Sequence, residues 1–164
     1  MVKMGKLNRV LAFIDRSLIM IAKILLAVMV IIVSVNVFMR YVLNSGIRWA
    51  EEISLVCIVW FTFIALAHGV KEKLHINMNL LPSKIARKLD IILDKLSNIT
   101  ILFVGYIMVH YGIKLVNVTS RSILPASNLP ASVIYFPLVL SGILIISNCL
   151  IEIMSFSNSL GGHD

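Results

Sequence analysis

The stretch 48–79, RWAEEISLVCIVWFTFIALAHGVKEKLHINMN, decides how the rest of the chain is interpreted. Its centre is an apolar run from Ile53 to Val70. Polar residues stand at both ends: Arg48, Trp49, Glu51 and Glu52 before the run, and Lys71, Lys73 and His75 after it. A helix needs about 20 apolar residues to cross a bilayer. The run therefore predicts a transmembrane helix with a polar group on each side of the membrane.

Composition extends this interpretation to the whole chain. Of its 164 residues, 59% are hydrophobic and 14% are charged, which excludes an ordinary soluble domain and a disordered chain. The net charge of +7 comes from basic residues that flank apolar runs, without any nucleic-acid motif beside them. We therefore expect contact with phospholipid and not with nucleic acid. Cys57 and Cys149 both lie inside apolar runs and are interpreted as packing residues.

Four apolar spans are predicted, at 17–42, 51–70, 97–120 and 131–154, within a single membrane domain 1–164. The fold class is therefore an all-α integral membrane protein.

The first run is longer than the apolar part of a signal peptide and no cleavage motif follows it, so we expect it to remain as the first helix. Pro137 falls inside the fourth span and is expected to bend or loosen its first turns.

The distribution of Lys and Arg predicts the orientation. Eleven of these residues lie before or in the first turns of the first span and between the second and third spans, whereas four lie on the opposite side. Basic residues accumulate on the cytoplasmic side of membrane proteins. Both termini and the middle loop are therefore predicted to be cytoplasmic, and the Trp-Glu-Glu group to be external.

The segment 83–96 has apolar residues at helical spacing opposite a basic face. This pattern predicts an amphipathic helix in the cytoplasmic headgroup region, between the second and third spans. The residues expected to contact lipid headgroups are Lys84, Arg87, Lys88 and Lys95. A solvated helical linker is the alternative.

Polar residues recur along the third span with spacings of four, four, three and four. They are Tyr106, His110, Lys114, Asn117 and Arg121, and this spacing places them in one stripe. The stripe could face another protein, or it could face the second span so that Lys114 and Arg121 approach the Glu pair. Alternatively, the two cations extend to the nearby interface and His110 is hydrogen-bonded inside the bundle.

The chain contains no pattern of catalytic or metal-binding residues. Phosphate-binding, zinc-protease and nucleophile-elbow motifs are absent. Glu51 and Glu52 are adjacent on a helix, so their side chains point in different directions and do not form an acid and base pair. We expect them to act in ion pairing, with Arg40 as one possible partner, or at an external docking surface. The chain is not expected to be an enzyme or to hold a cofactor.

Several short motifs together carry a resemblance to a known family. They are Arg40-Tyr41, Arg48-Trp49-Ala50-Glu51-Glu52, Trp60-Phe61, His75-Ile76, and Leu129-Pro130 with Tyr135 and Pro137. Their order and positions on the four spans resemble the small membrane subunit, of DctQ type, of tripartite ATP-independent periplasmic (TRAP) transporters. Ala65 and Asn79 depart from the family, which commonly has Gly and Asp at these positions.

The resemblance implies a role in a bacterial inner membrane as part of a three-part uptake system. Its partners would be a large membrane subunit of DctM type and a periplasmic substrate-binding protein of DctP type. The large subunit would use a sodium gradient to move organic acid anions such as C4-dicarboxylates or sialic acids. This chain would act as its scaffold, and Arg40, Arg48, Trp49, Glu51 and Glu52 would help to dock the binding protein. The alternative is a self-sufficient small oligomeric channel or exporter.

Overall fold

The computed structural model describes residues 2–71 and 83–160, and within them the side chains of residues 13–71 and 96–151. Four helices account for nearly all of this part: α1 (Val2–Val42), α2 (Ala50–Lys71), α3 (Ser83–Thr119) and α4 (Ser132–Leu160). Each contains a segment long and apolar enough to cross a membrane: Phe13–Val42, Ala50–Lys71, Leu96–Thr119 and Ser132–Ile151. The predicted all-α membrane fold with four spans is confirmed.

The segment 83–96 is helical, but it does not form a separate helix. It continues without a break into the third span as the first part of α3. The side chains of Lys84, Arg87, Lys88 and Lys95 lie outside the described residues. Their contact with lipid headgroups therefore stays a prediction.

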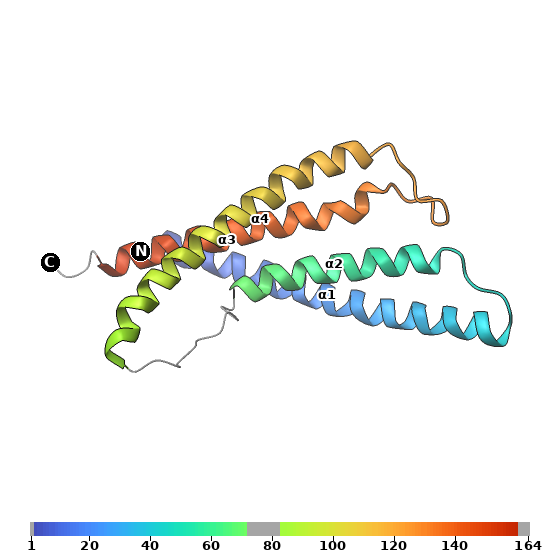
Figure 1. The fold of residues 1–164 in the computed structure, drawn as a ribbon, viewed down its shortest axis with the longest axis horizontal. Helices are drawn as coiled ribbons and strands as arrows, with labels where there is room; N and C mark the ends of the chain where they lie inside the picture. The colour runs from blue at the N-terminus through green and yellow to red at the C-terminus, as the bar shows by residue number, and fades with distance from the viewer. Residues whose placement is uncertain (1, 72–82, 161–164) are drawn as a thin grey trace.

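The four helices lie in a row and do not close into a bundle. α1 packs on α2, α2 packs on α4, and α4 packs on α3 (Figure 1). α1 and α3 are thus the two edges of the row. This arrangement leaves broad apolar faces uncovered, and in the most apolar part of α1 only 6% of the residues are buried.

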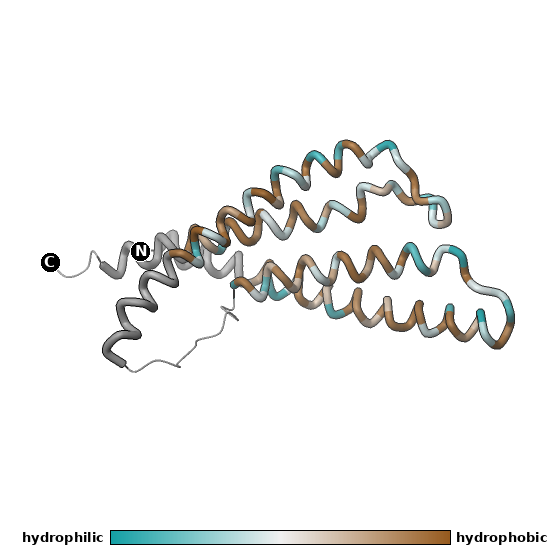
Figure 2. The backbone as a smooth tube through the Cα atoms, in the orientation of Figure 1, coloured by the Kyte–Doolittle hydropathy of each residue, from teal (hydrophilic) through white to brown (hydrophobic). Residues whose placement is uncertain are grey.

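Two short turns lie together at one end of the row, which we call the turn end; the chain termini lie at the other, the terminus end (Figure 1). The turn 43–49 joins α1 to α2, and the turn 120–131 joins α3 to α4. Hydrophobic residues dominate the helices, while hydrophilic ones gather at the turns (Figure 2). Both termini therefore lie on one side of the membrane, as four crossings require. Which side is cytoplasmic stays a prediction.

Glycines allow the backbones of α3 and α4 to approach closely. A Cβ atom on Gly142 would lie 2.8 Å from Val109 Cγ2 and 3.1 Å from the Gly105 carbonyl oxygen. A Cβ atom on Gly112 would lie 2.7 Å from Val139 Cγ2. Small residues have this role in membrane helix pairs because apolar side chains gain nothing by leaving lipid, so close packing must hold the helices together.

Buried side chains join the two hairpins at the middle of the row. Ala67 of α2, Met108 of α3 and Ile145 of α4 belong to one buried cluster. Cys57 and Cys149 are also buried and form no disulfide, and the Cys149 thiol donates to the Asn98 carbonyl at 3.4 Å. Their interpretation as packing residues is confirmed.

Candidate functional site

At the turn end, polar contacts join α1 to the α1–α2 turn and to the first turn of α2. The Asn36 side chain, which is buried, accepts a hydrogen bond from the Ile47 N–H at 2.8 Å. One turn further along α1, the Arg40 guanidinium donates to the Glu51 carboxylate at 2.8 Å. Both charged side chains are mainly exposed, at 60% and 68%, so the pair is an accessible surface feature. Arg40 therefore has the ion-pair partner that the sequence suggested.

Glu52 has a different role from Glu51, because it holds the second turn. Its carboxylate accepts hydrogen bonds from the Ala126 N–H at 3.0 Å and from the Ser127 N–H and hydroxyl, each at 2.7 Å. Within the turn, the Ser122 carbonyl accepts from the Ala131 N–H at 2.9 Å. Glu52 thereby ties α2 to the α3–α4 turn. The sequence did not predict this contact between residues more than 70 positions apart.

Two of the predicted docking residues are left on the surface. Arg48 and Trp49 are exposed in the α1–α2 turn. Arg48 makes no ion pair within the part of the chain that the structure describes. The turn end therefore presents Arg48 and Trp49 beside the Arg40–Glu51 pair, and Arg121 of the second turn is likewise exposed without an ion pair among the described residues.

Trp60 connects α2 to α4 at a defect in the α4 helix. Pro137 has no N–H, so the carbonyl of Val133, four residues earlier, receives no helical hydrogen bond from it. The indole N–H of Trp60 donates to this carbonyl at 2.9 Å. Its ring also stacks on Phe136, with centroids 6.0 Å apart. The predicted loosening at Pro137 is thus compensated by a side chain from the neighbouring hairpin.

Four residues of the predicted stripe, Tyr106, His110, Lys114 and Asn117, are exposed on α3 at the edge of the row, and the fifth, Arg121, is exposed just beyond it in the α3–α4 turn. Tyr106 stacks on His110 at 5.8 Å between centroids, His110 meets Tyr111 edge-on at 5.2 Å, and the Lys114 ammonium lies 5.4 Å from the Tyr111 centroid. α4 lies between α3 and α2, and neither Lys114 nor Arg121 forms an ion pair with Glu51 or Glu52 among the described residues. One alternative placed His110 inside the bundle with a hydrogen bond. The structure instead places its side chain on the exposed surface.

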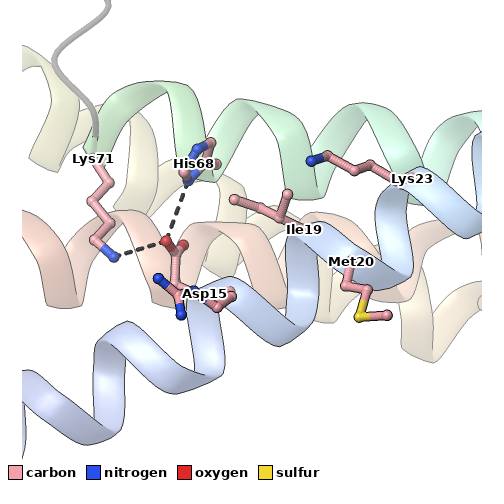
Figure 3. A pocket seen from close by; sticks show the side chains of 7 residues that line it. Asp15, Ile19, Met20, Lys23, His68 and Lys71 are labelled. Carbon is pink, nitrogen blue, oxygen red and sulfur yellow. Dashed lines mark hydrogen bonds and ion pairs between the residues drawn. The ribbon is translucent and has the colours of Figure 1, made fainter.

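At the terminus end, a second group of charged residues lines an open pocket of about 420 Å³ between α1 and α2 (Figure 3). The Asp15 carboxylate accepts a hydrogen bond from the Lys71 ammonium at 2.7 Å and lies 3.2 Å from His68 Nδ1. Asp15 is the most enclosed of the three, with 15% of its side chain exposed. Sequence reasoning missed this cluster. The available signal was an acidic residue within a basic flank, together with His68 and Lys71 three positions apart near the end of a span.

The described residues contain no group of three or more His, Cys, Asp or Glu side chains that could hold a metal ion. The arrangement offers ion pairs, helix contacts and exposed polar surfaces.

Four helices, each long and apolar enough to cross a membrane, define a multi-pass membrane protein. The family model for the DctQ component of tripartite ATP-independent periplasmic transporters matches residues 29–157. The chain belongs to this family, and it is a multi-pass protein of the bacterial inner membrane.

Curated relatives agree with the family assignment. Two putative TRAP transporter small permease proteins from Haemophilus influenzae are 29% and 25% identical to this chain. The first alignment covers 87% of this chain and 89% of the relative, and the second covers 82% of each. The ectoine TRAP transporter small permease protein TeaB from Halomonas elongata is 27% identical over 77% of this chain and 68% of its own length.

Proposed function

We propose that this chain is the fixed scaffold for a large membrane subunit of DctM type in a sodium-driven uptake system. The system takes up organic acid anions of the C4-dicarboxylate or sialic acid type, delivered by a periplasmic binding protein of DctP type. The chain itself carries no substrate or sodium ligands. One relative is named for ectoine, so the substrate varies among members, and our substrate class rests on the resemblance alone.

The observation that carries the scaffold proposal is the exposed stripe on α3. Polar side chains that face hydrocarbon are costly, so an intramembrane polar surface favours a protein partner. Lys114 lies five residues from the end of α3, and its long side chain can reach the interface. His110 lies nine residues from that end, roughly 14 Å along the axis at 1.5 Å per residue, and its side chain is too short to do so.

The arrangement of the helices supports the same role. A row of four helices covers more membrane width than a closed bundle of the same helices. A moving transport domain needs a static part that resists displacement, and a wide apolar body resists movement out of the membrane. The stripe on the edge helix then supplies a polar surface for attachment.

Co-purification tests the proposal. The tagged chain is expressed with its large subunit, and the ratio of the two proteins is measured after purification in mild detergent. We expect His110→Leu to lower this ratio roughly fivefold or more, because interhelical polar contacts contribute about 1–2 kcal/mol. Thr62→Val is the matched control, since Thr62 is exposed on α2 but its hydroxyl already donates to the Ile58 carbonyl of its own helix.

The outcome also separates a partner surface from a lipid-facing one. If the stripe faced lipid, Leu would be tolerated better than His, and the ratio would be unchanged. An unchanged ratio in His110→Leu, or no large subunit recovered with the unmodified chain, would contradict the scaffold proposal.

A further inference from the structure

The pocket between α1 and α2 at the terminus end has a charge imbalance that its internal contacts do not resolve. Its lining contains three cations and one carboxylate: Arg16, Lys23, Lys71 and Asp15. Asp15 is already engaged by Lys71 and His68. Arg16 and Lys23 form no ion pair within the described part of the chain. The pocket is therefore left with unpaired positive charge.

Lys23 is the most informative of these residues because it lies well inside the apolar span Phe13–Val42. It is eight residues after Asp15, roughly 12 Å further along the helix. Figure 3 shows its side chain extending back along α1 toward Ile19, on the side of the pocket where His68 lies. An unpaired ammonium at such a depth is costly, and an anion in the pocket would remove that cost.

The rest of the lining suits a ligand with an anionic head and an apolar body. Ile19 and Met20 lie on α1 beside the charged groups, and Met20 is 66% exposed. The pocket is open, and Asp15, Arg16 and Lys71 in its lining stand near the ends of the apolar spans Phe13–Val42 and Ala50–Lys71, where the polar region of a bilayer would begin. Basic pockets between transmembrane helices bind the phosphate groups of anionic lipids.

We propose that this pocket is a binding site for the phosphate of an anionic phospholipid. Arg16 and Lys23 bind the phosphodiester, while Ile19 and Met20 contact the glycerol and the first part of an acyl chain. Asp15 contacts Lys71 and His68 and does not repel the ligand, because its charge is neutralised by Lys71.

Native mass spectrometry of the full chain tests the site. The protein is purified from nanodiscs of phosphatidylcholine containing phosphatidylglycerol, and the lipid that remains bound is counted. We expect preferential retention of phosphatidylglycerol. Lys23→Met, which keeps the length of the side chain and removes its charge, should lower the affinity for this lipid roughly fivefold. Arg16→Gln should have a similar effect, and Lys23→Arg should retain binding.

Two further variants test whether lipid retention depends on this pocket in particular. Lys114→Met removes a cation from the turn end and should leave lipid retention unchanged. Asp15→Asn removes the negative charge while preserving size, so it should retain or increase phosphatidylglycerol binding even if it lowers thermal stability. Inorganic phosphate added to nanodiscs of pure phosphatidylcholine should not stabilise the protein against heat as phosphatidylglycerol does.

Equal retention of both lipids by the unmodified chain would overturn the proposal. So would an effect of Lys114→Met as large as that of Lys23→Met, or loss of lipid in Asp15→Asn. If inorganic phosphate gave the full stabilisation, the pocket would be a site for free anions and not for lipid.

Discussion

Trp60 combines two contacts at one position, a stacked ring and a hydrogen bond to the carbonyl that Pro137 leaves free. Backbone polar groups in membrane helices must be satisfied inside the protein, because lipid offers no hydrogen bonds. Trp60 therefore allows α4 to contain a proline at this depth. It also makes the two hairpins depend on each other.

Replacing Trp60 by Phe tests this dependence. Trp60→Phe keeps an aromatic ring but leaves the Val133 carbonyl without its donor, so we expect a loss of about 1–3 kcal/mol in stability. Thermal unfolding of the purified chain in nanodiscs measures the change.

The matched background is Pro137→Ala, in which the new Ala N–H can bond to the Val133 carbonyl within the helix. Trp60→Phe should then cost about 1 kcal/mol less than it does in the unmodified chain. Equal costs in the two backgrounds would show that Trp60 contributes packing alone.

Glu51 and Glu52 form a pair of matched variants, since they are adjacent and differ in their partners. Glu52→Gln should increase hydrogen exchange at the Ala126 and Ser127 amides, because one carboxylate oxygen that accepts from them is lost. Glu51→Gln should not, because Glu51 bonds only to Arg40 in the described structure. A similar increase in both variants would contradict the distinct role assigned to Glu52.

At the scale of elements, the α3–α4 hairpin depends on close contact between backbones. Gly142→Ala should lower thermal stability by about 1–3 kcal/mol, because the new methyl group would lie 3.1 Å from the Gly105 carbonyl oxygen. Backbone cannot move aside as a flexible side chain can. Ala is favoured over Gly in helices by about 1 kcal/mol, so without a steric conflict the substitution would raise the stability. A loss of stability therefore indicates a steric conflict.

Gly46→Ala is the control for this substitution. Its nearest atom would be Arg40 Nε at 3.4 Å, an ordinary contact, and its backbone φ is not positive. Thermal unfolding should therefore be unchanged. If Gly142→Ala stabilised the protein, the close approach of α3 and α4 would be wrong.

The helices could be predicted from the sequence because each span is long, apolar and bounded by charged or turn-forming residues. Their order in the row could not. In soluble proteins a polar face shows which side of a helix is outward, but lipid-facing residues are as apolar as buried ones. Nothing in the sequence therefore distinguishes Gly105 and Gly142, which lie in close contact, from the other glycines in the chain.

The candidate site could also be predicted only in part from the sequence. Charge and spacing predicted the polar stripe and offered an ion pair of Arg40 with one of the two glutamates, but the choice of Glu51 comes from the structure. Glu52 with Ser127, Trp60 with Val133, and Asp15 with His68 each join residues more than 50 positions apart. Such contacts depend on which helices are neighbours, and this information is missing from a single sequence.

At the scale of the whole molecule, the turn end is the surface proposed for the binding protein. Arg48→Glu should slow association of the binding protein several-fold, because charges at the rim of an interface act mainly on the association rate. The reference variant exchanges Arg40 and Glu51 by Arg40→Glu with Glu51→Arg, which keeps both the ion pair and the net charge. Surface plasmon resonance on the two-subunit membrane complex measures both rates.

An unchanged rate in Arg48→Glu would remove Arg48 from the docking surface. If the exchanged variant slowed association as much as Arg48→Glu does, Arg40 would instead contact the binding protein directly.

The scaffold assignment is tested most directly by uptake into proteoliposomes under a sodium gradient. Vesicles contain this chain alone, the large subunit alone, or both, each with the binding protein and whichever of succinate or sialic acid it binds. We predict uptake only when both membrane subunits are present. Accumulation in vesicles that contain this chain alone, or full uptake by the large subunit without it, would contradict the account.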